Sequence, residues 1–300
     1  MKGFNKTPGV TQFVLVGFSS LRELQLLLFV IFFLLYLTIL VANVSIMAVI
    51  RFSQTLHTPM YGFLFILSFS ESYYTFVIIP QLLAHLLSDT KIISFLACAT
   101  QLFFFLGFAC TNCFLIAVMG YDCYVAICHP LRYTLIMNKR LWFGLVSLSG
   151  VTGFFIALVA TKLICDMPFC GPNRVNHYFC DLACTDTHLK ELALFSLSIL
   201  VIMVPFLLIL TSYGFIVNTI LKIPSAEGKR KAFATCASHL TVVFVHYGCS
   251  NSASDKDQLV AVTYTVVTPL LNPLVYSLKN QEVKTALKRV LGITVAIKMN

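Results

Sequence analysis

The sequence predicts an all-α membrane protein, in which a bundle of seven transmembrane helices is followed by a short amphipathic C-terminal helix. Of the 300 residues, 58% are hydrophobic and 11% are charged, against ~25% charged residues in soluble domains. Long apolar runs recur along the chain, and the first, 24–50, exceeds the ~20 residues that cross a ~30 Å hydrocarbon layer. Basic residues gather on one side of these runs, which is typical of membrane proteins.

The apolar runs predict one domain over residues 1–300 with approximate spans at 25–50, 59–83, 96–121, 141–164, 192–221, 231–249 and 259–278. Helices are the default spanning form because the bilayer core offers the backbone no other hydrogen-bond partner. A barrel would instead show ~10-residue segments of alternating polarity. The sixth range is the most polar, since it contains Ser238, His239, Thr241 and His246. A buried helix of soluble type is the alternative there.

The charge distribution predicts an outer N-terminus and a cytoplasmic C-terminus. With that orientation the inner segments hold 13 of the 21 basic residues and three acidic residues, whereas the outer segments have no net charge. The inner charge faces anionic membrane lipid, so the net charge of +9 needs no nucleic-acid partner. The first twenty residues lack the pattern of a cleavable signal peptide, and we expect the first span to act as a signal anchor.

Two features of the predicted outer side agree with this orientation. Asn5 begins an Asn-Lys-Thr acceptor for N-glycosylation. Cysteines crowd the predicted outer ends of spans three to five, which favours disulfides in an oxidising compartment, although spacing alone leaves their pairing open: Cys98, Cys165, Cys170, Cys180 and Cys184. Zinc is disfavoured because Cys180 and Cys184 have no matched second pair.

The segment after the last span alternates apolar and basic residues. Val283, Ala286, Leu287 and Val290 recur at helical spacing, which predicts a short helix on the inner membrane surface. A disordered basic tail is the alternative.

Five motifs in order carry a resemblance to a known family: LHTPMY at 56–61, MGYDCYVAICHPLRY at 119–133, SY at 212–213, KAFATCASHL at 231–240 and TPLLNPLVYSLKN at 268–280. In these the chain resembles the olfactory (odorant) receptors, within the rhodopsin-like class A G-protein-coupled receptors. The resemblance implies a plasma-membrane receptor that binds a small volatile odorant. It also implies activation of a stimulatory heterotrimeric G protein, which raises cAMP, on the cytoplasmic face.

The resemblance implies a ligand site between the outer halves of the helices, where bundles hold small molecules. Its residues are Phe105, Leu106, Ala109, Cys110, Leu197, Val201, Tyr247, Val262 and Thr265. None is charged, and a buried ion needs a partner charge. The site therefore favours a mostly apolar molecule oriented by Tyr247 or Thr265, and plain helix packing is the alternative role of each residue.

The resemblance also implies a conformational switch and a buried polar cluster. Glu71 is a carboxyl group in mid-membrane, which needs partners or water. The resemblance groups it with Asn43, Asn112 and Asn272 around water and sodium, and a protonated structural Glu is the alternative. Pro273 favours a kink with two neighbouring packings. The remaining implied switch residues are Asp122, Cys123, Tyr124, Tyr213 and Tyr276.

Three departures from the family pattern bear on output. Cys123 stands where the family has the arginine of an Asp-Arg-Tyr triplet, and cysteine offers neither the charge nor the forked donors of arginine. The implied disulfides are Cys98–Cys180 and Cys170–Cys184, but the loop between Cys180 and Cys184 is about six residues short. The segment 246–260 lacks about nine residues. The alternative prediction is therefore a receptor-like protein of the same fold with impaired or no signalling.

Other function classes lack their required residues. No nucleophile-base-orienter set, Gly-rich phosphate loop or HExxH motif suggests an enzyme, and no cofactor is predicted. A retinal pump needs a Schiff-base lysine in the seventh span, and 259–278 contains none. A secondary transporter would show repeated halves or paired broken helices, which the sequence does not.

Overall fold

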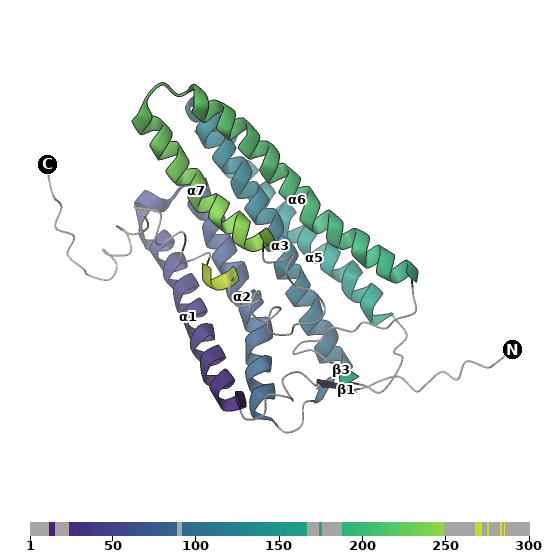
Figure 1. The fold of residues 1–300 in the computed structure, drawn as a ribbon. Helices are drawn as coiled ribbons and strands as arrows, with labels where there is room; N and C mark the ends of the chain where they lie inside the picture. The colour runs from purple at the N-terminus through teal and green to yellow at the C-terminus, as the bar shows by residue number, and fades with distance from the viewer. Residues whose placement is uncertain are drawn as a thin grey trace.

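A computed structural model describes residues 12–15, 24–88, 92–166, 174–175, 188–248, 268–271, 275, 283 and 285. Its described part is a bundle of long α-helices that run up and down past one another (Figure 1). The long helices are α1 (Gln25–Phe52), α2 (Pro59–Leu87), α3 (Phe95–Cys128), α5 (Lys139–Cys165), α6 (His188–Lys222) and α7 (Ala226–Gly248). Short helices η2 (Gln54–Leu56), η3 (Pro130–Arg132) and α4 (Tyr133–Ile136) occupy the turns after α1 and α3.

Five helices in the described part are long and apolar enough to cross a membrane: α1, α2, α3, α5 and residues Leu192–Lys222 of α6. Helix α7 covers the range predicted for the sixth span, and its polar residues set it apart from those five. Most of the predicted seventh span lies outside the described residues, of which 268–271 and 275 are helical. Of the predicted C-terminal helix, Val283 and Thr285 are described, and both are helical.

Local sequence signals set several helix starts. Pro59 occupies the first turn of α2, where a missing backbone donor costs nothing. The Ser94 hydroxyl accepts a hydrogen bond from the Ala97 N–H and caps α3, and the Asn138 side chain caps α5 in the same way at Leu141. Pro205 lies inside α6, where it removes a backbone donor.

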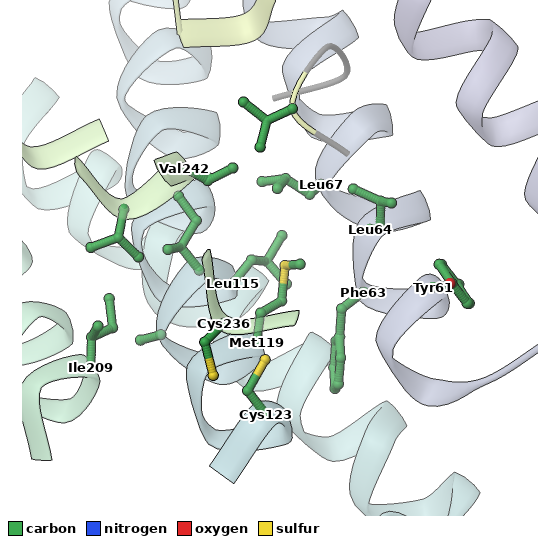
Figure 2. Close-up of a cluster of buried hydrophobic side chains, with 14 of the residues drawn as sticks. Tyr61, Phe63, Leu64, Leu67, Leu115, Met119, Cys123, Ile209, Cys236 and Val242 are labelled. Atoms are coloured by element: carbon green, nitrogen blue, oxygen red, sulfur yellow. The ribbon is translucent and has the colours of Figure 1, made fainter. Parts of the chain in front are cut away.

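Helix α3 lies at the centre and packs against α2, α5, α6 and α7. The largest buried cluster joins these helices in the half of the bundle that holds the C-terminal end of α3 (Figure 2). Phe63, Leu67, Leu115 and Ile209 are almost fully buried in it. A second cluster joins α1 and α2 around Ile39.

The outward faces of α1 and α6 are apolar and exposed in the isolated chain. Leu26, Phe33 and Val41 of α1 and Phe195 and Leu207 of α6 are each more than 40% exposed. In water such a surface would drive association, whereas in lipid it costs nothing. The packing therefore fits a bundle surrounded by lipid.

A three-stranded sheet of order β2-β1-β3 lies at the end of the bundle where α3 begins (Figure 1). Strand β1 (Gln12–Leu15) pairs antiparallel with β2 (Ile92–Ser94) and parallel with β3 (Arg174–Val175). The segment before α1 therefore lies beside the α2–α3 connection and the segment after α5. The sequence pattern did not predict this sheet, because strands of two to four residues carry too little alternation.

Close packing between α3 and α5 depends on Gly153. A Cβ atom at this position would lie 2.7 Å from the Thr111 backbone nitrogen and 3.0 Å from its Cα. At Gly150, one turn earlier on α5, a Cβ would meet nothing within 4 Å. The two glycines thus form a matched pair for testing this interface.

We expect Gly153→Ala to lower the free energy of unfolding by about 1–3 kcal/mol, because the helices must separate to admit the methyl group. The measurement is the Tm of the purified chain in detergent, with Gly150→Ala as the control. Equal Tm values for the two variants would contradict this packing.

Candidate ligand site and inner polar network

Part of the predicted ligand wall comes together where α3 meets α5 and α6. Cys110 of α3 forms a buried cluster with Val201 and Ile156, and Leu197 packs against it. Ile156 lies on α5 and was not predicted; its place in the wall depends on the α3–α5 packing, which sequence periodicity alone does not specify. All four side chains are apolar or weakly polar, so this wall offers a ligand no charge.

The other predicted α3 residues lie nearer to α2. Phe105 and Ala109 pack against the cluster around Ile39, and the ring centroids of Phe105 and Tyr74 are 5.2 Å apart. Leu106 is half-buried. The predicted α3 residues therefore divide between two sides of the helix, with Cys110 toward α6 and Phe105 toward α2.

Many of the predicted site residues belong to parts of the chain that the structure does not describe. The following lie outside the described residues: Asn5, Cys170, Cys180, Cys184, Val262, Thr265, Asn272, Pro273 and Tyr276, together with the side chain of Tyr247. Cys98 is buried and disulfide-bonded. None of the other cysteines of the described part forms a disulfide, so the partner of Cys98 lies outside it. The pairing Cys98–Cys180 and the pairing Cys170–Cys184 stay predictions.

A small cavity with several polar side chains in its lining lies between α2, α3 and the helical segment 268–271. Its volume is about 40 Å³, and its lining includes Glu71, Asn112 and Thr268. All three side chains are buried, and the Asn112 Oδ1 and Thr268 Oγ1 atoms have no hydrogen-bond partner among the described residues. Ala109, predicted for the ligand wall, also lines this cavity.

Asn43 of α1 forms a hydrogen bond to Pro269, one of the residues that line this cavity. Its side chain is fully buried, and its Nδ2 donates to the carbonyls of Ile39 at 3.1 Å and Pro269 at 3.2 Å. Asn43, Glu71 and Asn112, which the resemblance groups together, therefore lie in one region of the bundle. Their role in a switch stays a prediction. One carboxyl group with neutral oxygens suits water or a hard cation in a space of this size. Sodium at this place stays a prediction.

At the opposite end of α3, Asp122 is buried and hydrogen-bonded. Its Oδ1 accepts from the Tyr133 hydroxyl at 2.9 Å. Burial and the neighbouring Asp122 carboxylate raise the pKa of Tyr133, which keeps this phenol protonated and able to donate. Tyr133 was part of a sequence motif without an assigned role. Here it provides Asp122 with the donor that Cys123 cannot provide.

The Cys123 side chain lies in the apolar core. It is 4% exposed and belongs to the same cluster as Met119 and Cys236 (Figure 2). The adjacent Tyr124 hydroxyl lies 3.2 Å from the His129 Nε2 atom. The triplet Asp122-Cys123-Tyr124 therefore contributes one buried carboxyl, one buried thiol and one surface-directed phenol.

His239 joins three helices through its two ring nitrogens. Its Nε2 lies 3.0 Å from the Ile116 carbonyl oxygen of α3, and its Nδ1 lies 2.9 Å from the Tyr213 hydroxyl of α6. A carbonyl only accepts, so Nε2 carries the hydrogen and Nδ1 accepts from Tyr213. His239 is buried and was not predicted as a switch residue. The sequence signal was its place in the KAFATCASHL motif, three residues after Cys236.

The fold and these contacts define a multi-pass helical membrane protein with buried polar groups that hydrogen-bond between its helices. A family model described as "Olfactory receptor" matches residues 32–293. Human Olfactory receptor 10T2 is 85% identical, with 100% of both chains covered. Human Olfactory receptor 10R2 is 55% identical over 97% of this chain and 91% of its own, and mouse Olfactory receptor 10J5 is 49% identical over 96% and 98%. The chain belongs to the olfactory receptor family, a family of seven-helix odorant receptors that couple to G proteins.

The alignment with Olfactory receptor 10T2 bears on the predicted short loops. It spans 315 positions, fifteen more than the 300 residues of this chain. At least fifteen aligned positions therefore have no residue here. The shortening of the segments around 179–186 and 246–260 stays a prediction, because the alignment length does not say where those positions fall.

We expect Tyr213→Phe to lower the free energy of unfolding by about 1–3 kcal/mol, because it leaves the buried Nδ1 of His239 without a donor. The Tm of the purified chain reports this loss. Tyr73→Phe on α2 is the matched control, since Tyr73 is 47% exposed. A Tyr213→Phe variant as stable as Tyr73→Phe would show that the contact has no stabilising role.

Proposed function

We propose that this odorant receptor binds a small, mostly apolar, neutral volatile molecule and activates a stimulatory heterotrimeric G protein from the plasma membrane. The observation that carries the proposal is the full-length similarity to olfactory receptors, joined to an uncharged wall on α3 and α6. Cys110, Leu197 and Val201 form that wall in the described part of the chain. An ammonium or carboxylate ligand would find no partner charge there.

The proposed orientation places the sheet end of the bundle outside the cell. The opposite end presents basic side chains at the turns that join the helices, and Arg132, Lys139, Arg140, Lys222 and Arg230 are all exposed there. An excess of basic residues in short loops marks the cytoplasmic side. The same basic surface suits an acidic face of a G protein.

In this proposal, the strength of G-protein activation depends on Cys123. An arginine there would be buried next to Asp122, which now takes its hydrogen bond from Tyr133. Because cysteine cannot make a forked, charged contact with a G protein, the alternative of impaired signalling rests on this position and on the shortened loops. The similarity to proteins described as olfactory receptors favours signalling.

Ligand chemistry is tested with a cAMP reporter and a panel of neutral, amine and acid volatiles. We expect responses among neutral apolar compounds. Val201→Phe should remove at least nine-tenths of the response by filling the wall, whereas Met203→Phe on the lipid side of α6 should retain it. A panel that activates only through amines or acids would refute the ligand class.

We expect Cys123→Arg to raise odorant-driven cAMP per surface receptor about tenfold, in line with the ~1.4 kcal/mol of one added charge-assisted contact. Cys123→Met adds bulk without charge and serves as the control. Surface labelling normalises both variants. A Cys123→Arg response no greater than that of Cys123→Met would show that the missing guanidinium does not limit output.

A further inference from the structure

A large cavity in the described part of the chain lies away from the predicted ligand wall, on the outer surface of the bundle. It has a volume of about 610 Å³ and lies between α3, α5 and α6. This is within the ~300–1,000 Å³ range of pockets that hold small molecules. Its rim includes Leu148, Leu208 and Phe215, which are each more than half exposed. The cavity therefore opens toward lipid, and its occupant would arrive from the bilayer.

The cavity has the depth of one leaflet. Its α3 lining runs from Phe114 to Tyr124, which at 1.5 Å per residue is about 15 Å, half of a ~30 Å hydrocarbon layer. These residues lie in the half of the bundle that holds the C-terminal end of α3. An occupant of this length would reach from mid-membrane to the membrane surface.

The hydroxyl groups inside the cavity are mostly engaged already. Ser149 donates to the Leu145 carbonyl, and Thr211 and Ser212 each donate to carbonyls one turn earlier on α6. No charged side chain lines the cavity. A phospholipid headgroup would therefore find no partner charge, and the long axis of the cavity suits a rigid apolar body.

Two hydroxyls of the lining make no hydrogen bond within the described residues, and they lie at opposite ends. Tyr121 is near the membrane surface and is 38% exposed, whereas Thr152 is near mid-membrane. Tyrosine in this position commonly anchors at the lipid–water boundary. Its free phenol offers one hydrogen bond to a single hydroxyl at that depth.

We propose that this cavity is a binding site for a membrane sterol, whose hydroxyl bonds to Tyr121 and whose ring system lies along Val118 and Leu145 toward Thr152. A sterol is neutral, rigid, about one leaflet long and carries one hydroxyl, which matches each feature of the cavity. Bound there it joins α3, α5 and α6. This site is separate from the odorant wall and does not depend on the ligand proposed for it.

The test uses the full chain in phosphatidylcholine nanodiscs with a photoreactive, clickable cholesterol. Labelled peptides are mapped by mass spectrometry. We expect adducts on 114–124, 145–152 and 208–215, competed by excess cholesterol. Thr152→Trp, which fills the mid-membrane end, should lower labelling at least fivefold. Val151→Trp, one residue earlier and 69% exposed, should leave it unchanged.

A second variant keeps the test decisive if tryptophan at 152 prevents folding. Tyr121→Phe changes only an exposed hydroxyl, and it should weaken cholesterol labelling about threefold or more while abolishing the preference for cholesterol over its 3α-hydroxyl epimer. Labelling spread evenly over all spans would overturn the proposal. So would labelling of this cavity by a photoreactive phosphatidylcholine at equal efficiency, or a Tyr121→Phe chain that labels as the parent does.

Discussion

The whole structure depends on one constraint: inside lipid, every backbone hydrogen bond must be made within the protein, and most hydroxyl groups also find their partners there. The long helices meet this demand for the backbone. Serine and threonine side chains meet it by donating to the carbonyl one turn earlier, as Ser45, Ser72 and Thr111 do. Polar residues can therefore be abundant in spanning helices without facing water, which leaves the remaining buried polar groups free to hold helices together.

Those remaining groups lie where helices meet α3 or α1. His239 connects α7 to α3 and α6, Asp122 holds Tyr133 beside the end of α3, and Asn43 connects α1 to Pro269. The contacts of Asn43 and His239 join elements far apart in sequence, whereas that of Asp122 joins α3 to the turn that follows it. A buried polar contact has strong geometric requirements, so a small shift of one helix breaks it completely. Such contacts are suited to a receptor that must change between two packings.

The sequence predicted the class of fold and the approximate helix ranges because hydropathy reports lipid contact directly. It predicted ends less well: α3 continues to Cys128 rather than 121, and α7 begins at Ala226 rather than 231. Helices continue beyond the hydrocarbon layer, where charged and polar residues no longer mark a boundary. The resemblance named Tyr213 and Asn43, and the structure supplied their partners. It also showed that Phe105 and Cys110 lie on different sides of α3, since five residues at ~100° each place the two side chains ~140° apart around the helix.

Features that depend on the packing of three helices could not be predicted from the sequence. Three such features arise from how α5, α6 and α7 pack around α3: the place of Ile156 in the cluster around Cys110, the contact of His239 with the Ile116 carbonyl, and the cavity between α3, α5 and α6. Periodicity gives the face of one helix but not the neighbour that meets it. The sheet formed by β1 was missed for a related reason, because its partners come from two distant connections.

The central claim is that this chain crosses the membrane with β1 outside and the basic helix turns in the cytoplasm. The most direct measurement places one epitope tag before residue 1 and another after residue 300, and stains intact and permeabilised cells. The account predicts that the first tag is stained in intact cells and the second only after permeabilisation. Staining of both tags on the same side, or recovery of the chain as a soluble protein, would contradict it.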